Sequence, residues 1–290
     1  MKPRENLVTV CGHNTTMLYH MLRHYQYNVK EIFVILYAHH KKDPVIEQGL
    51  HILEKFNLKP HKIVYERPFD WARVTEHYNE TKMLKPDEWW IVADLDEFAV
   101  FPKPLEQFIY EDLMYNDVDF MYGIMLDRIG ENGEFSELTY DDNIWKKFPN
   151  VGFISRSIRK NDVNWAGLLK GKYKLYEGQH KFTHFPNSHE EYANYIKDNK
   201  SLIQIHHFRW KKDHIDIEKE YVKMGEKWWG AQHQKVLDYM LEHNKIDVKD
   251  SRFLIENCPN DKFDSYSKWN DVLKLPTYDD ENDNPRPTYY

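Results

Sequence analysis

Two aspartates that follow an apolar segment are the residues of this chain best suited to chemistry. Trp89–Ala93 has the length and composition of a buried strand, and Asp94 and Asp96 come directly after it. Alternation along a strand places residues i and i+2 on one face, so the two carboxylates can converge. Converging carboxylates repel unless a cation or protons lie between them, and hard oxygen ligands suit Mg²⁺ or Mn²⁺, which in turn suit a diphosphate. The alternative is a strand end followed by a solvated acidic turn.

The adjacent histidines His206 and His207 form a second group of candidate ligands. Neighbours on a strand point to opposite faces, so only one of the two is expected to reach a site shared with Asp96. A carboxylate plus one imidazole is an adequate ligand set for Mn²⁺ when a diphosphate supplies further oxygens. Arg209 and Lys212 follow at once and can neutralise phosphate charge. The alternative is a basic surface strand with a structural histidine.

A polar turn after the first predicted strand is a candidate nucleotide contact. It contains Cys11, His13 and Asn14, whose backbone and side chains can hold a nucleobase or ribose. An ordinary helix N-cap is the equally weighted alternative. The turn lacks the glycine pattern of a dinucleotide site or a phosphate loop, so neither cofactor class is indicated.

Two further histidines, His180 and His184, lie between Gly178 and Pro186, which predict a loop. A zinc pair is disfavoured because no cysteine is near and the His-Glu-x-x-His pattern is absent. Hydrogen bonding to a sugar or phosphate is the preferred interpretation.

Asp127 is the candidate general base. It follows the predicted strand Phe120–Leu126, where a carboxylate can accept the proton of an acceptor hydroxyl. The alternative is an ion pair with the neighbouring Arg128. No Gly-x-Ser-x-Gly motif and no reactive-cysteine context is present.

The elements that must position these residues alternate between strand and helix. We predict strands at residues 7–11, 31–37, 61–65 and 89–93, with helices at 17–26, 44–56 and 69–84. Further on we predict a helix at 105–115, strands at 120–126, 152–158, 173–176 and 203–208, and a long helical segment at 216–243. Alternating strands and helices indicate an α/β fold with a mainly parallel sheet.

Bulk composition narrows the class of protein. The chain has 290 residues, a net charge of −7 and 15% aromatic residues, which suit both a core and sugar stacking. No basic block indicates nucleic-acid binding, and no apolar run is long enough to span a membrane. The N-terminus lacks the apolar part of a signal peptide, and two distant cysteines are typical of free thiols in a reducing compartment. We expect a cytoplasmic protein with a single domain over 1–275 and an acidic, mobile tail over 276–290.

Together these motifs resemble a family. The chain is similar to GT-A fold glycosyltransferases of the family-2-like group, whose members carry Trp-x-x-x-x-Asp-x-Asp-Glu-Phe. The match runs from Trp89 to Phe98, and weaker elements follow in the family's order at 126–128, 148–149, 169–171, 178–180 and 205–208. The composition, rich in Lys, Asn and Tyr, also resembles that of small virus-encoded glycosyltransferases.

The resemblance implies a nucleotide-sugar donor, usually a UDP-sugar, and Mn²⁺ or Mg²⁺. It implies that Asp94 lies near ribose and metal, that Asp96 binds the metal and that a late histidine completes the site. It adds Lys170 and His180 to the donor-binding residues and divides the domain into a nucleotide-sugar half over 1–100 and an acceptor half over 101–275.

Family members of this kind are generally inverting and need one carboxylate base, but the chain lacks the Glu-Asp pair that the best-known members carry at a late helix. Two other functions stay open. A sugar nucleotidyltransferase also needs an Asp-x-Asp metal site, and a non-catalytic carbohydrate-binding protein would explain the aromatic content.

Overall fold

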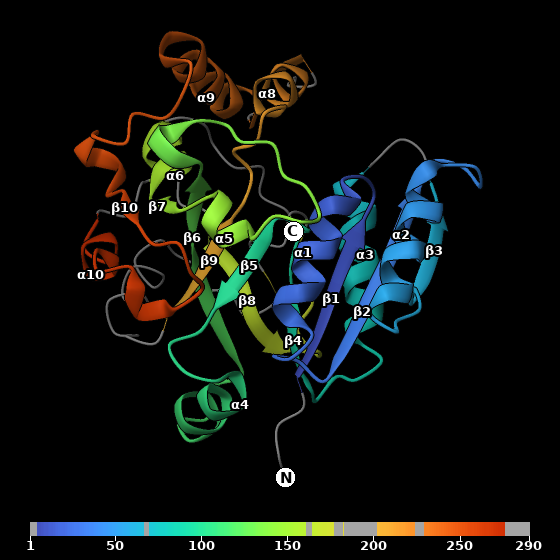
Figure 1. The fold of residues 1–290 in the computed structure, drawn as a ribbon. Helices are drawn as coiled ribbons and strands as arrows, with labels where there is room; N and C mark the ends of the chain where they lie inside the picture. The colour runs from blue at the N-terminus through green and yellow to red at the C-terminus, as the bar shows by residue number, and fades with distance from the viewer. Residues whose placement is uncertain are drawn as a thin grey trace. The chain divides into compact units, whose positions relative to one another are not determined.

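The structure is a computed structural model that describes residues 5–66, 70–160, 164–176, 182, 202–223 and 229–275 (Figure 1). The described chain forms two compact units, each assembled from separate stretches of sequence. The first comprises residues 5–66, 70–124, 164–176, 182 and 202–205, and the second comprises 125–160, 206–223 and 229–275. The single domain over 1–275 stays a prediction, and so does its division into a nucleotide-sugar half over 1–100 and an acceptor half over 101–275.

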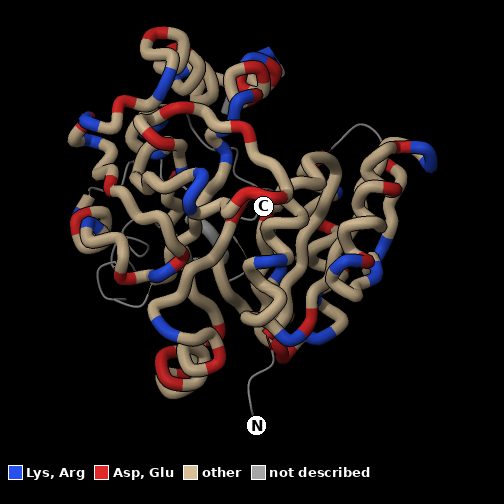
Figure 2. Tube along the Cα trace, viewed as in Figure 1, with Lys and Arg blue, Asp and Glu red and all other residues tan. Residues whose placement is uncertain are grey.

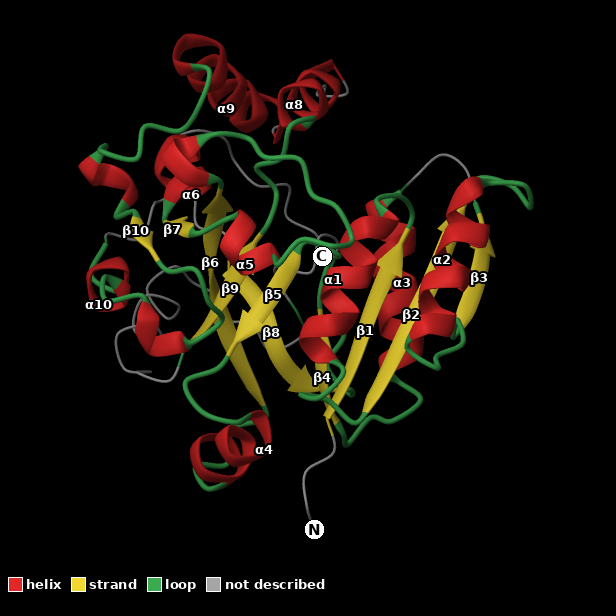
Figure 3. Cartoon of the chain, viewed as in Figure 1, coloured by secondary structure: helices red, strands yellow, loops and turns green. Residues whose placement is uncertain are grey.

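Four parallel strands form the centre of the first unit. They are β1 (Glu5–Cys11), β2 (Glu31–Ala38), β3 (Lys62–Tyr65) and β4 (Trp89–Val92), in the spatial order β4-β1-β2-β3. β8 (Asn164–Lys170) adds to β4 in the antiparallel direction, and the first half of β6 (Phe120–Ile129) pairs with β8. β5 (Glu97–Val100) pairs with β9 (Ile203–His207). The predicted α/β class with a mainly parallel sheet flanked by helices is therefore confirmed (Figure 3).

Each of the three long helices of this unit begins at a capping side chain. α1 (Thr15–Tyr25), α2 (Pro44–Lys55) and α3 (Trp71–Lys82) follow Asn14, Asp43 and Asp70, whose side-chain oxygens accept a backbone N–H of the first turn. Such caps satisfy donors that the helix itself leaves unpaired. Right-handed crossovers place α1 and α2 on one face of the sheet and α3 on the other, because the chain reverses its progress across the sheet after β3.

This reversal creates a switch point between β1 and β4. The strands are hydrogen-bonded neighbours with Val8 opposite Val92, and the Ala93 N–H donates to the Val8 carbonyl at 3.3 Å. Ligands of open α/β sheets bind at the carboxyl ends of the strands at such a point. Cys11, the last residue of β1, and Asp94, in the turn after β4, lie at this position. The unit also contains α4 (Leu105–Phe108), which continues as the π-helix η1 (Ile109–Met114).

The second unit is built on a smaller antiparallel sheet. The second half of β6 pairs with β7 (Asn150–Gly152), which pairs with β10 (Glu256–Asn257). The helices are α5 (Ile144–Lys147), α6 (Ile154–Arg159), α8 (His214–Lys223), α9 (Trp229–His243) and α10 (Trp269–Val272), with the short 3₁₀ turns η2 (Glu131–Gly133), η3 (Ser251–Phe253) and η4 (Phe263–Ser265).

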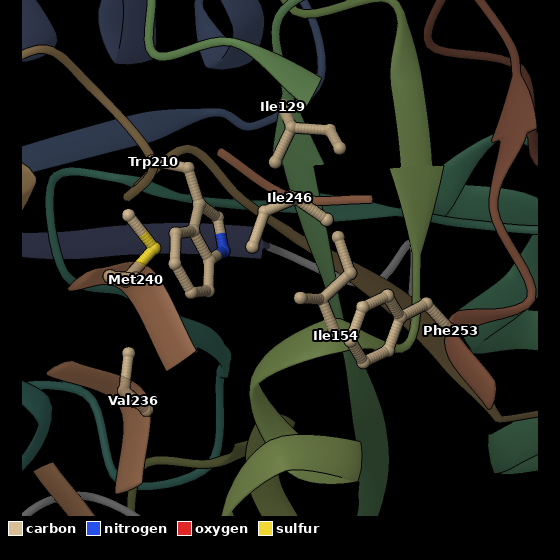
Figure 4. Close-up of a cluster of buried hydrophobic side chains, with 7 residues drawn as sticks. All are labelled: Ile129, Ile154, Trp210, Val236, Met240, Ile246 and Phe253. Carbon is tan, nitrogen blue, oxygen red and sulfur yellow. The ribbon is translucent and has the colours of Figure 1, made fainter. Parts of the chain in front are cut away.

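A cluster of fully buried apolar side chains holds this unit together. It joins β6, α6, α9 and the segments after β9 and α9, and consists of Ile129, Ile154, Trp210, Val236, Met240, Ile246 and Phe253 (Figure 4). All seven are 0% exposed, so loss of any one of them leaves a cavity that its neighbours fill only in part.

Two predicted strands differ from the structure. The strand predicted at 152–158 is wrong: β7 ends at Gly152 and α6 follows, because Ile154 and Ile158 are four residues apart and pack against the same cluster. The strand predicted at 173–176 is wrong, since only an isolated bridge joins Leu175 to Phe182. The predicted 216–243 helix corresponds to α8 and α9, and residues 224–228 lie outside the described part, as does the predicted tail at 276–290.

Both signs of charge are interspersed along the described trace (Figure 2). Among the described residues no helix combines the length and the apolar character needed to cross a membrane.

Met240→Ala tests the buried cluster. Met240 is 0% exposed, so the substitution should lower the free energy of unfolding by about 2 to 5 kcal/mol in urea titrations. Leu241→Ala on the same helix is the control, because Leu241 is 60% exposed and should change stability by less than about 0.5 kcal/mol. Equal effects from the two variants would contradict the orientation of α9.

Candidate functional site

The turn between β4 and β5 brings three carboxylates together in the first unit. The Glu97 N–H donates to the Asp94 carbonyl at 3.0 Å, and the Asp94 N–H donates to Glu97 Oε2 at 3.2 Å. Asp94 and Asp96 are partly exposed, whereas Glu97 is 3% exposed. The turn therefore fixes the backbone from which all three acidic side chains project.

Tyr78 on α3 connects this turn to β1. Its hydroxyl donates to Asp94 Oδ1 at 3.0 Å and accepts the Val10 N–H at 3.3 Å. Burial and the neighbouring Asp94 carboxylate hold the pKa of the Tyr78 phenol well above its usual value, so the phenol remains a donor. The sequence shows no signal for this contact, because α3 meets the turn only in the folded sheet.

The donor set of this turn fits a hard divalent cation. One carboxylate oxygen of Asp96 and one of Glu97 lie within 4.8 Å of each other, a spacing that a shared ion can bridge. Glu97 extends the predicted Asp94 and Asp96 pair. The strand-and-turn pattern of the sequence gives Glu97 no separate role.

The turn after β1 contains the predicted nucleotide contacts. Asn14 adopts a left-handed conformation with φ 52°, and its side chain accepts the Met17 N–H at 3.4 Å, as the N-cap alternative predicts. Cys11 is fully buried, its Sγ donates to the His13 carbonyl at 3.5 Å, and burial raises the pKa of its thiol to about 12. His13 is exposed. Contact of these three residues with a nucleotide stays a prediction.

Lys170 and His180 are the other two residues predicted to bind the nucleotide-sugar donor. Lys170 pairs across the sheet with Trp89, the first residue of β4, and its Nζ lies 5.0 Å from that indole ring. It therefore occupies the opposite end of β4 from Asp94. His180 lies outside the described residues.

Asp127 is the centre of a buried hydrogen-bond group in the second unit. It is 2% exposed, and its Oδ2 accepts the Ser155 N–H at 2.5 Å. Its Oδ1 accepts the Ser155 hydroxyl at 2.8 Å and lies 3.2 Å from His207 Nδ1. Burial alone would raise the pKa of Asp127, but the hydrogen bond and charge of His207 and the Ser155 amide bring it below its usual value. The role of general base stays a prediction.

Arg128 and His206 form a separate group. The Arg128 Nε donates to His206 Nδ1 at 2.9 Å, and the other guanidinium nitrogens donate to the carbonyls of Cys258 at 2.5 Å and Asn260 at 3.0 Å. Burial lowers the pKa of Arg128 to about 9. The guanidinium thus donates to His206 and to the backbone before η4. It does not form the ion pair with Asp127 that the alternative predicted.

Arg209 lies in a cluster around the buried carboxylate of Glu218. Arg209 donates to Glu218 Oε1, and His233 Nδ1 lies 2.7 Å from Glu218 Oε2. Arg159 approaches Oε1 to 3.9 Å. Burial would raise the pKa of Glu218, but the charge of Arg209 and the hydrogen bond of His233 lower it to about 2. Lys212, in contrast, is 75% exposed and forms a surface ion pair with Glu137 at 3.4 Å.

Comparisons with known proteins give only distant likenesses. No protein-family model matches, and no curated protein matches. Among solved structures the chain is similar to residues 1–349 of S. aureus TarS at 10% identity and a TM-score of 0.32, over 82% of this chain and 70% of that one. TarS in complex with UDP-GlcNAc gives 10% identity, a TM-score of 0.34 and coverage of 82% and 71%. A 4-diphosphocytidyl-2C-methyl-D-erythritol synthase gives 12% identity and a TM-score of 0.31, over 58% of this chain and 76% of that one. Scores this low do not carry a functional assignment.

Tyr78→Phe tests the bridge between β1 and the carboxylate turn. Removal of the hydroxyl leaves the buried Val10 N–H without this acceptor, so the free energy of unfolding should fall by about 1 to 3 kcal/mol. Tyr27→Phe, at a position 88% exposed, should leave stability unchanged. If the two variants are equally stable, the bridge contributes nothing.

Glu218→Gln tests the charge cluster through the pH dependence of stability. The Glu218 pKa lies near 2 in the folded state against 4.5 for the free side chain. A carboxyl group whose pKa is lower in the folded than in the unfolded state stabilises the fold above about pH 4.5. That contribution disappears as the pH falls toward 2.

The difference in unfolding free energy between wild type and Glu218→Gln should therefore be largest at neutral pH and shrink by about 2 kcal/mol between pH 7 and pH 3, where the folded pKa has not yet been reached. Urea titrations between pH 7 and pH 3 measure it. Asp216→Asn, 80% exposed on the same helix, is the control and should show a small difference throughout. A difference that does not change with pH would contradict the proposed charge balance.

Proposed function

We propose that this protein is a metal-dependent glycosyltransferase that moves a sugar from a nucleotide-sugar donor, in the first instance a UDP-sugar, to a hydroxyl acceptor. The observation that carries the proposal is the carboxylate turn at the switch point between β1 and β4. A chain that binds a diphosphate through a cation needs acidic oxygens at this edge of the sheet, and Asp94, Asp96 and Glu97 are placed there.

The motif order suggests the roles of the other residues. Asp94 and Asp96, with one of His206 and His207, would hold Mn²⁺ or Mg²⁺, and Cys11, His13 and Asn14 would contact the nucleoside. When bound, the cation would offset the charge that grows on the departing diphosphate. The pocket would orient donor and acceptor and exclude water. We further propose an inverting reaction and a cytoplasmic location.

A sugar nucleotidyltransferase is the second candidate, because it also needs acidic metal ligands at this edge. Such enzymes usually carry a glycine-rich loop with lysine or arginine after the first strand. Here the turn from Gly12 to Asn14 contains neither cation, and it closes directly into α1 through the Asn14 cap. This turn favours the transferase.

Titration with UDP in the presence and absence of Mn²⁺ tests the proposal. A glycosyltransferase should bind UDP tightly only with the cation, and should slowly hydrolyse one member of a panel of nucleotide sugars. Pyrophosphorolysis of a nucleotide sugar would identify the nucleotidyltransferase. No binding of UDP with or without Mn²⁺, together with no turnover of any nucleotide sugar, would indicate a carbohydrate-binding protein.

Asp96→Ala should abolish transfer and Mn²⁺-dependent UDP binding while the protein stays folded, since removal of one carboxylate also relieves repulsion. Isothermal titration calorimetry measures the binding, and circular dichroism checks the fold. Asp87→Ala is the matched control, because Asp87 is exposed and precedes β4 at its other end. Wild-type activity in Asp96→Ala, or its simple unfolding, would refute the assignment.

A further inference from the structure

The neighbouring histidines of β9 meet partners of opposite hydrogen-bonding character. His206 Nδ1 lies 2.9 Å from Arg128 Nε, and a guanidinium can only donate. His207 Nδ1 lies 3.2 Å from Asp127 Oδ1, and an ionised carboxylate can only accept. A neutral imidazole carries one proton, so the two rings must hold it on different nitrogens. In the neutral rings, these partners assign the proton of His206 to Nε2 and the proton of His207 to Nδ1.

These tautomers distinguish the two candidate ligands. In His206 the lone pair of Nδ1 is used by Arg128, and Nε2 carries the proton. In His207 the lone pair is on Nε2, the nitrogen that faces away from Asp127. A metal-binding imidazole commonly donates its other ring N–H to a carboxylate, which fixes the ring and makes the ligand nitrogen more basic. The arrangement of His207 and Asp127 has this form.

We propose that Asp127 is a positioning residue, which holds His207 in the Nδ1–H tautomer so that its Nε2 can ligate a divalent metal ion. The inference rests on the proposed function for the identity of the ligand, but the tautomer itself does not depend on it.

The supports of Asp127 explain why its carboxylate keeps this orientation. Oδ2 accepts the Ser155 N–H and Oδ1 accepts the Ser155 hydroxyl, so the first turn of α6 fixes both oxygens. Asp127 and Ser155 are 2% and 5% exposed, respectively. Little room remains for the carboxylate to turn toward an acceptor hydroxyl, which favours positioning over the role of general base.

The same geometry makes Asp127→Asn a specific probe. The Ser155 amide can only donate, so the asparagine oxygen must take the Oδ2 position. Its NH₂ group then occupies the Oδ1 position and has to donate to His207 Nδ1, while the Ser155 hydroxyl can rotate to accept. His207 must consequently move its proton to Nε2 and lose the ligand lone pair. An aspartate-to-asparagine change in a serine protease triad acts in the same way.

The experiment compares wild type, Asp127→Asn and Ser155→Ala, each with ¹⁵N-labelled histidine and without metal, in buffer alkaline enough to keep the rings neutral. Nitrogen chemical shifts report which ring nitrogen carries the proton, and a His207→Ala sample assigns the His207 signals. We expect Nδ1–H on His207 in wild type and in Ser155→Ala, which keeps the backbone donor. We expect Nε2–H on His207 in Asp127→Asn alone, with His206 unchanged as Nε2–H in all three.

Mn²⁺ affinity, measured from the electron paramagnetic resonance signal of the free ion, is the second readout. It should fall about 10- to 100-fold in Asp127→Asn and stay close to wild type in Ser155→Ala. Nε2–H on His207 in wild type would overturn the proposal even if Asp127→Asn does not fold. An Asn variant that keeps its tautomer and Mn²⁺ affinity but turns over roughly two to four orders of magnitude more slowly would overturn it in favour of a general base. If wild type binds no Mn²⁺ at all, the proposed function fails, and the tautomers still report on Asp127.

Discussion

Buried charge is the constraint on which the second unit depends. A charged side chain that leaves water loses much free energy unless hydrogen bonds and opposite charges replace the solvent. Asp127, Arg128 and Glu218 are at most 2% exposed, and each meets partners from elements distant in sequence. Asp127 ties β6 to α6 and β9, Arg128 ties β6 to the chain before η4, and Glu218 ties α8 to α9. Loss of one partner would leave the remaining charge buried without compensation, which is why these contacts define the unit.

This organisation has a consequence for the two histidines of β9. The histidine pair on β9 is held by two consecutive residues of β6, of which one is an obligatory donor and one an obligatory acceptor. Because neighbouring residues on a strand point to opposite sides, the two rings are supplied with opposite partners without any irregularity of the backbone. A rigid second layer of hydrogen bonds is what a metal-binding imidazole requires to keep its ligand nitrogen oriented. Asp127 and Arg128 form this layer, and as buried charged groups they need hydrogen-bond partners in any case.

The first unit follows a different rule, in which the order of strands creates the site. The reversal between β1 and β4 places the carboxyl ends of two neighbouring strands side by side. Tyr78 secures the edge by accepting from β1 and donating to Asp94 through one hydroxyl. The acidic side chains thereby project from a turn that is held at both ends, which suits a cation and a diphosphate better than a mobile loop would.

The sequence by itself determined the α/β class, the strands and helices of the first 93 residues to within a few positions, and the acidic turn after β4. Apolar periodicity and capping residues are local signals, so they can be recognised in the sequence alone. Only the tertiary structure decided which polar groups meet: Tyr78 with Asp94, and Asp127 with Ser155 and His207. It also replaced a predicted strand by α6, the helix that carries Ser155. The physical reason is that hydrogen-bond partners far apart in sequence are selected by strand order, register and helix packing, which no local pattern of residues encodes.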